Sequence, residues 1–354
     1  MFAEYCEKFP EDKARWDKYH TAVDAEALYN NDAFWAKEEK AVATRALSGK
    51  KINFLKDILP NLIGGSADLA PSNKTHMDGE SDFSKTNYAG RNLHFGVREL
   101  AMAAIENGLM LHGGLRAYVA TFFVFSDYMK PMMRLAALMH LPTTYVLTHD
   151  SIGVGEDGPT HEPIEQLAML RSLPNFNVFR PADATETAAG WYLAVTSTKT
   201  PTALVLTRQN LPQLPGSSKE ALKGAYVVSE AKDPANMAGI LIGTGSEVSL
   251  AIEAQEELGK SGIDVRVVSM PCMDLFEQQS EEYKESILPK DVRARVAVEA
   301  LSSFGWGRYV GLDGATVCME SFGASAPANL LFEKFGFTKQ HVVEVAMKVI
   351  AACK

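Results

Sequence analysis

The densest group of residues able to do chemistry is GVGEDGPTH, Gly153 to His161, which places two acids and a histidine among three glycines and a proline. The apolar, β-branched run TTYVLTHD precedes it and predicts a strand, and EPIEQLAMLRSL follows it with the apolar spacing of a helix. The stretch is therefore predicted to be a strand-to-helix loop, the place in an α/β sheet where ligands usually bind. Glycine and proline also shape tight turns that bind nothing, so the loop alone leaves both interpretations open.

Three further stretches carry residues of interest, each with a plain structural explanation beside the chemical one. GGSADLAPSNKT, Gly64 to Thr75, is rich in small and polar residues and predicts a loop after an apolar run. Glu99, in GVRE, stands in the first turn of a predicted helix, where an acid usually serves the helix dipole at the surface. Arg208, in LTRQN, ends a predicted strand and is by itself a weak sign of a phosphate site.

Aromatic residues recur at steps of three where a predicted strand passes into a helix: Phe122, Phe125 and Tyr128. This spacing is more typical of a packed core than of a cofactor pocket. The turn GTGSEV invites a dinucleotide-binding interpretation, but Val248 stands where the third glycine is needed. A plain strand-to-helix turn with Ser246 as its N-cap is the simpler interpretation.

The elements that must position these residues alternate between strand and helix from about residue 40 to 215. That order predicts an α/β fold with a mostly parallel sheet covered by helices. A polar stretch follows, and the pattern restarts in a second, smaller α/β unit. The first 40 residues, rich in charge and aromatic side chains, predict a helical or irregular lead-in. We therefore expect three parts, at 1–40, 41–218 and 219–354.

Composition narrows the class of protein. The 354 residues carry a formal net charge of -9, which argues against a general nucleic-acid binder. No 18-residue apolar run predicts a membrane span, and the first residues are too charged for a signal peptide. The four cysteines form no CxxC pair and the eight histidines no HxxxH or HExxH pattern, so neither predicts a metal site. We expect plain thiols in a reducing compartment, the cytoplasm.

Taken together and in this order, GGSADLAPSN, HFGVRE, THDSIGVGEDGPTHEP, LTRQN and GTGSEV resemble the motifs of transketolase. The similarity runs from about residue 40 to the C-terminus and covers the lead-in loosely. Of that family's three α/β domains, the resemblance implies only the second and third. Residues 41–218 would form the pyrimidine-binding domain and 219–354 the C-terminal domain, after a helical or irregular linker over 1–40.

The resemblance implies transfer of a two-carbon ketol unit from a ketose phosphate to an aldose phosphate, with thiamine diphosphate and Mg²⁺ or Ca²⁺. The family's metal–diphosphate motif, GDG followed by an asparagine, is not found, and the nearest stretch, LDGATV, lacks the asparagine. We therefore expect the metal on a partner domain, and a chain that is inactive without it. The expected partner is the N-terminal transketolase half, as a separate subunit or as the missing part of a truncated chain, in a homodimer or heterotetramer.

The resemblance also assigns roles to residues. Glu99 would bond the pyrimidine ring of the cofactor and favour the tautomer that takes the reactive proton, and His161 would act on the donor sugar. The implied cofactor-binding residues are Asp68, Glu99, Phe122, Phe125 and Tyr128. The implied substrate-binding residues are Arg45, Ser72, His149, Asp157, His161 and Arg208. Charge-assisted bonds from the arginines, and from a protonated or donating histidine, suit a sugar phosphate.

Other functions remain open at this point. Dihydroxyacetone synthase, deoxyxylulose phosphate synthase and the β subunit of a 2-oxo acid dehydrogenase share the architecture. EDGPTHEP, with Arg45 and Arg208, favours transketolase over the last two, whereas dihydroxyacetone synthase has nearly the same motifs. A non-catalytic dimerisation module or fragment is the alternative of a different class.

Overall fold

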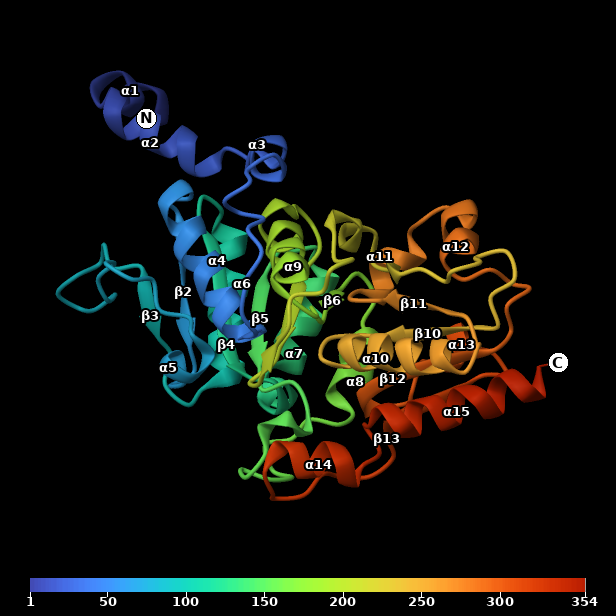
Figure 1. Ribbon diagram of the computed structural model, residues 1–354. Coiled ribbons are helices and arrows are strands. Elements are labelled where there is room, and N and C mark those ends of the chain that lie inside the picture. The colour runs from blue at the N-terminus through green and yellow to red at the C-terminus, as the bar shows by residue number, and fades with distance from the viewer. Residues whose placement is uncertain (354) are drawn as a thin grey trace.

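The computed structural model describes residues 1–353 as two α/β units side by side, with N-terminal helices projecting from one end (Figure 1). The projecting helices are α1 (Phe2–Lys8) and α2 (Pro10–His20), and α3 (Ala25–Tyr29) leads back to the body. No residue of α1 or α2 is buried, so this segment adds little to the core.

The larger unit is built on a sheet of six parallel strands in the order β3-β2-β4-β5-β7-β6. The strands are β2 (Leu62–Ser66), β3 (Asn92–His94), β4 (Arg116–Phe122), β5 (Thr144–Thr148), β6 (Asn177–Phe179) and β7 (Thr202–Leu206). The helices are α4 (Thr44–Ile58), α5 (Ala70–Asn73), α6 (Glu99–His112), α7 (Ser126–Leu138), α8 (Gln166–Arg171) and α9 (Ala184–Thr196), with the 3₁₀ turns η1 (Phe123–Phe125) and η2 (Ile152–Val154).

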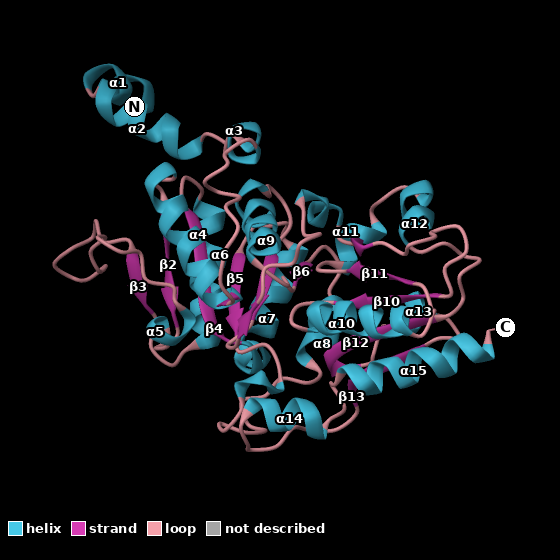
Figure 2. Ribbon diagram, in the orientation of Figure 1, coloured by secondary structure: helices cyan, strands magenta, loops and turns pink. Residues whose placement is uncertain are grey.

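Both faces of this sheet are covered by helices, as Figure 2 shows. Tyr118 of β4 belongs to the core cluster that contains Ile52 of α4 and Trp191 of α9. The next residue, Val119, points the other way and belongs to the cluster that contains Met102 of α6. Because successive strand residues are buried on opposite faces, the strands read as continuous apolar runs, and the predicted parallel sheet is confirmed.

The smaller unit has five strands in the order β13-β12-β10-β11-β9, all parallel except the edge strand β9. The strands are β9 (Tyr226–Ser229), β10 (Gly239–Gly243), β11 (Val265–Ser269), β12 (Arg295–Ser302) and β13 (Ala315–Met319). The helices are α10 (Glu247–Lys260), α11 (Met273–Glu277), α12 (Glu281–Ile287), α13 (Gly307–Val310), α14 (Ala328–Lys334) and α15 (Lys339–Ala352), after the 3₁₀ turn η3 (Lys219–Lys223). The second α/β unit is thus confirmed, with an antiparallel edge that the pattern did not reveal.

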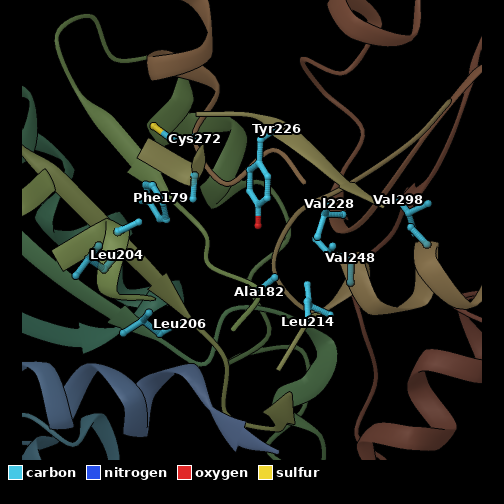
Figure 3. Close-up of a cluster of buried hydrophobic side chains, with 14 of the residues drawn as sticks. Phe179, Ala182, Leu204, Leu206, Leu214, Tyr226, Val228, Val248, Cys272 and Val298 are labelled. Atoms are coloured by element: carbon cyan, nitrogen blue, oxygen red, sulfur yellow. The ribbon is translucent and has the colours of Figure 1, made fainter. Parts of the chain in front are cut away.

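The two units share one buried interface. Figure 3 shows apolar side chains from both units gathered there, among them Phe179 and Leu204 from the larger unit and Val228 and Val298 from the smaller one. The hydroxyl of Tyr226 lies in this cluster and donates to Glu186 Oε1 at 2.8 Å. A shared apolar core makes the two units one packed body rather than two domains on a flexible tether.

The run EEKAVATRALSGKKINFLKDIL, which begins at Glu38, has the pattern of one amphipathic helix, but its first residues are not helical. Val42–Ala43 forms β1, which pairs antiparallel with β8 (Asn210–Leu211), and α4 begins only at Thr44. The reason is a pair of bonds to the residue after β7: Thr44 N donates to Thr207 Oγ1 at 3.0 Å, and Thr207 N donates to Thr44 Oγ1 at 2.7 Å. These contacts between distant parts of the chain override the local helical pattern.

The predicted loop from Gly64 to Thr75 is wrong for its first three residues, which belong to β2. Gly64 and Gly65 are there because the neighbouring strands approach closely. A Cβ on Gly64 would lie 2.4 Å from the carbonyl oxygen of Tyr118, and one on Gly65 would lie 1.8 Å from that of Leu93. A glycine pair that suggests a loop can therefore mark a crowded strand.

Gly65→Ala is expected to destabilise the protein by about 2–3 kcal/mol or more, because the carbonyl of Leu93 is backbone and has no rotamer to escape into. Gly108→Ala, in α6 with nothing within 4 Å of the added Cβ, is the matched control and should be neutral or stabilising by up to about 1 kcal/mol. Urea unfolding of both variants checks this. Equal midpoints would contradict the crowding of β2.

Candidate active site

The candidate residues follow the carboxyl ends of neighbouring parallel strands. Asp68 and Ser72 come after β2, Glu99 after β3, the three aromatic residues at the end of β4, His149 to His161 after β5, and Arg208 after β7. Arg45 joins them from the first turn of α4, which the Thr44–Thr207 bonds fix beside the end of β7. Parallel strands end at the same sheet edge, so residues scattered over more than 160 positions gather in one place.

Arg45 and His149 form the centre of a bonded chain. Arg45 Nη1 donates to the carbonyl of Ser72 at 2.8 Å and lies 3.3 Å from His149 Nε2. His149 Nδ1 lies 2.7 Å from Thr148 Oγ1, which in turn donates to Asn73 Oδ1 at 2.8 Å. Because the guanidinium can only donate, Nε2 accepts, and the ring proton sits on Nδ1 facing Thr148.

The surroundings keep His149 neutral. Burial, and then the positive charges of Arg45 and Arg208, lower the pKa of His149 to about 3. Burial and Arg208 also lower the pKa of Arg45. Of the two forms that the sequence left open, a protonated and a neutral histidine, the structure favours the neutral one. The positive charge of this corner comes from Arg45 and from the exposed Arg208.

The aromatic residues form a row that ends in histidines. The rings of Phe122 and Phe125 are nearly parallel, with centroids 6.2 Å apart, and Tyr128 follows Phe125 at 6.1 Å. His149 lies 3.8 Å from Phe122, and His161 lies 5.5 Å from Phe125, edge-on. Phe122 is buried whereas Tyr128 is exposed, so the row runs from the core to the surface. The spacing of three therefore makes a partly open aromatic wall, not a closed core stripe.

Three further candidates, Glu99, Asp68 and Asp157, lie at this edge without a direct contact to the Arg45–His149 chain or to the aromatic row. Glu99 is the first residue of α6 and its side chain is only 8% exposed, so it is not the surface acid of the dipole interpretation. No hydrogen bond to its carboxyl is found among residues 1–353. Asp68, in a left-handed conformation with φ of 62°, and Asp157 are both exposed.

The segment from Gly155 to Glu162, here called the His161 loop, is shaped by turns. His161 N donates to the carbonyl of Gly158 at 2.9 Å, and Gly158 N donates to that of Gly155 at 3.0 Å. Glu162, which the sequence did not single out, is 2% exposed, and neither carboxylate oxygen has a partner among the described residues. Its chain position beside His161 was the available signal.

Burial raises the pKa of Glu162 to about 7, with a smaller lowering influence from the backbone N–H of Ala324. The folded protein therefore holds this proton more tightly than the unfolded chain, so the stability that it contributes is full below about pH 4.5 and is lost as the pH rises towards 7. Glu162→Gln should remove up to about 3 kcal/mol of this pH dependence. Glu156→Gln, an exposed neighbour, should leave it unchanged. Unfolding midpoints from pH 4.5 to 8 test this, and parallel curves for wild type and Glu162→Gln would contradict it.

A buried ionic network, also missed in the sequence, joins the site to the smaller unit. Arg180, after β6, donates from Nε to Asp150 Oδ2 at 2.9 Å and from Nη1 to Glu247, the first residue of α10. All three side chains are fully buried. Nearby, Arg171 makes two 2.8 Å bonds to Glu299 of β12. Asp150 directly follows His149, so this network abuts the candidate site.

The same network rules out the dinucleotide interpretation of GTGSEV. Arg180 fills the space over this turn, where a Cβ on Gly245 would lie 2.8 Å from its guanidinium carbon. Helix α10 begins after Ser246 as expected, but the Ser246 side chain makes no capping bond and donates instead to Glu247 Oε1. The space over this turn, which a nucleotide would need, is occupied by Arg180 of the larger unit.

Residues 1–353 contain no group of three or more His, Cys, Asp or Glu side chains that could hold a metal ion. No helix in this range has both the length and the apolar character needed to cross a bilayer.

Fold and site together define an α/β protein that offers aromatic, cationic and carboxyl groups at the carboxyl edge of a parallel sheet. Two family models match the chain: the pyrimidine-binding domain of transketolase over residues 40–213, and the transketolase-like C-terminal domain over residues 224–338. A transketolase of Bacillus subtilis is 55% identical over 349 residues, which are 97% of this chain and 52% of the relative. The chain belongs to the transketolase family and carries its pyrimidine-binding and C-terminal domains.

Solved structures agree. Transketolase from Leishmania mexicana superposes with a TM-score of 0.91 at 43% identity, over 99% of this chain and 51% of that one. A structure described as "Split gene transketolase, inactive beta4 tetramer" superposes with a TM-score of 0.71 at 26% identity, over 89% of this chain and 100% of that one. The chain thus spans about half the length of the curated relatives it matches.

Proposed function

We propose that the chain supplies one half of a transketolase active site, for transfer of a two-carbon ketol unit from a ketose phosphate to an aldose phosphate. One observation carries the proposal: Arg45, His149, His161 and the aromatic row meet at one sheet edge with Glu99 on the adjoining helix. An orphan dimerisation module needs none of these groups, and their chemistry suits a sugar phosphate beside a flat ring.

The residues at this edge fit thiamine diphosphate. Phe125 is half-exposed in the aromatic row and offers a face for a flat heteroaromatic ring. Glu99 is a buried carboxyl, which in this proposal donates a hydrogen bond to a ring nitrogen of the pyrimidine and shares its proton with that nitrogen. When bound, the cofactor supplies the electron sink for carbon–carbon bond cleavage. Phe122 and Tyr128 flank this face, and exposed Asp68 approaches from the end of β2.

The substrate is bound by the remaining candidates. Arg45 and Arg208 hold the phosphate by charge-assisted bonds, with Ser72 and neutral His149 fixing Arg45. His161 and Asp157, on the His161 loop, bond the hydroxyls of the donor sugar. Different loops at one sheet edge thus bind the two ends of an extended sugar phosphate.

A partner completes the site. We infer that the diphosphate and its Mg²⁺ or Ca²⁺ are held by the N-terminal transketolase half, as the half-length coverage of the relatives suggests. Helices α6 and α7, and the residue after α7, carry exposed large apolar side chains: Leu100, Ile105, Leu111, Leu135, Leu138 and Met139. Such a patch fits a protein interface, so we propose assembly with that half and with a second copy, in the cytoplasm.

Isothermal titration of thiamine diphosphate with magnesium tests the proposal. We expect weak or no binding to this chain alone and binding at least about a hundredfold tighter once the missing half of a relative, such as the N-terminal part of the Bacillus subtilis transketolase, is added. Tight binding to the chain alone would refute the half-site. Failure of the mixture to bind would refute the function.

A further inference from the structure

The His161 loop rests on the smaller unit. Ser325 Oγ donates to the carbonyl of Glu156 at 2.6 Å, in the residue before Asp157. Next to this bond, α14, which follows Ser325, packs against η2, which precedes Glu156. Figure 1 shows α14 beneath the larger sheet. Further along, Ser302 N donates to the carbonyl of Ile164 at 3.0 Å. The smaller unit therefore holds the chain on both sides of the His161 loop, from residue 152 to 164, although it contributes no candidate site residue.

Glycines make this contact close. Gly155 and Gly158 both have positive φ, of 85° and 76°, so each turns where other residues would be strained. A Cβ on Gly158 would lie 3.1 Å from Ser325 Cβ, and one on Gly155 would lie 3.5 Å from the carbonyl oxygen of Ala326. The loop has little internal stiffness, and the wall beside it limits the conformations left to it.

Glu162 closes the contact from the loop side. Its carboxyl fills the space over Gly323, where an added Cβ would lie 1.8 Å from Oε2 and 3.3 Å from Ile152 Cγ2. A larger residue at position 323 would therefore have to displace the Glu162 carboxyl, whereas its backbone conformation would not be strained, since Gly323 is not among the positive-φ glycines. Ser325 and Gly323 together define a short wall, residues 323–326, against which the loop lies.

We propose that the wall formed by residues 323–326 of the C-terminal domain positions the His161 loop, with Ser325 and Gly323 as positioning residues for Asp157 and His161. This inference rests on the proposed function for its catalytic consequence. The wall touches no substrate; it restricts a glycine-rich loop so that two sugar-binding side chains are already in place. A loop that is no longer restricted would hold these two side chains less precisely and so bind the ketose phosphate more weakly.

Hydrogen exchange of the chain by itself tests the positioning without any activity. Ser325→Ala should speed exchange in residues 155–162 by about fivefold, the effect of one lost hydrogen bond, and Ser325→Thr should restore protection. Gly323→Ala should speed exchange in the same residues more than tenfold. Gly323→Ala combined with Glu162→Ala should recover most of the lost protection. Ser321→Ala, at an exposed serine nearby, and Gly259→Ala, with open space around it, are the controls and should stay within twofold of wild type.

Kinetics in the assembled enzyme give the second readout. Ser325→Ala should raise the KM for the ketose phosphate about fivefold and change kcat less than twofold, because the reacting centre itself is intact. If wild-type chain and partner half show no ketol transfer, the proposed function fails while the exchange result still decides the positioning. Unchanged exchange in both Ser325→Ala and Gly323→Ala would overturn the inference even in an active enzyme.

Discussion

Glu99→Gln is expected to lower the kcat of the assembled enzyme by about 10²–10⁴-fold while the KM for sugar phosphate changes little. The amide keeps the size of the carboxyl but cannot give a proton to a ring nitrogen and take it back. The Glu99 carboxyl is buried at the start of α6 and has no partner in the described chain, so we expect kcat to be sensitive to this substitution. Steady-state ketol transfer with saturating cofactor measures the change.

The matched control is Glu26→Gln, an exposed glutamate in the first turn of α3. Both substitutions remove a negative charge near a helix N-terminus, so each costs a few tenths of a kcal/mol of helix stability. Only Glu99→Gln should affect kcat. Equal activity of the two variants would remove Glu99 from the mechanism.

Arg180→Met is expected to destabilise the chain by about 3–5 kcal/mol, because it leaves the buried carboxyls of Asp150 and Glu247 without their cation. Burial already raises the pKa of Asp150, and Arg180 opposes this. Without Arg180 the carboxyl of Asp150 would be protonated more easily in the folded state, so the loss should shrink as the pH falls.

Denaturant unfolding at pH 5 and pH 8 measures this effect. Arg15→Met, which breaks the exposed pair with Asp12 on α2, is the control and should cost under about 1 kcal/mol at either pH. A loss of similar size for both variants would mean that the network between the units adds no more than a surface ion pair.

Regular alternation made the fold predictable. The run RAYVATF, which has the pattern of a strand, corresponds residue for residue to β4. The run SDYMKPMMRLAALMH, which has the pattern of a helix, corresponds to α7 except for its last two residues, because α7 ends at Leu138. The predictions failed where distant contacts decide. Gly64 and Gly65 are strand residues because β2 pairs with β3 and β4, and β1 exists only because β8 pairs with it.

The gathering of the candidate residues at one sheet edge was predictable for a different reason. The candidate residues follow strand ends, and the topology of a parallel sheet brings strand ends together. Arg180, Asp150 and Glu162 were missed because charged residues are usually exposed, and sequence gives no sign of a buried partner. The neutral state of His149 likewise depends on its burial and then on Arg45, which is 104 positions away in the chain.

Reconstitution of ketol transfer tests the half-site most directly. This chain is mixed with the N-terminal half of the Bacillus subtilis relative, thiamine diphosphate, magnesium, a ketose phosphate and an aldose phosphate, and the transferred product is followed over time. We predict turnover in the complete mixture and none when either half is left out. Turnover by this chain alone, or its absence from the complete mixture while the intact relative is active in the same assay, would contradict the account.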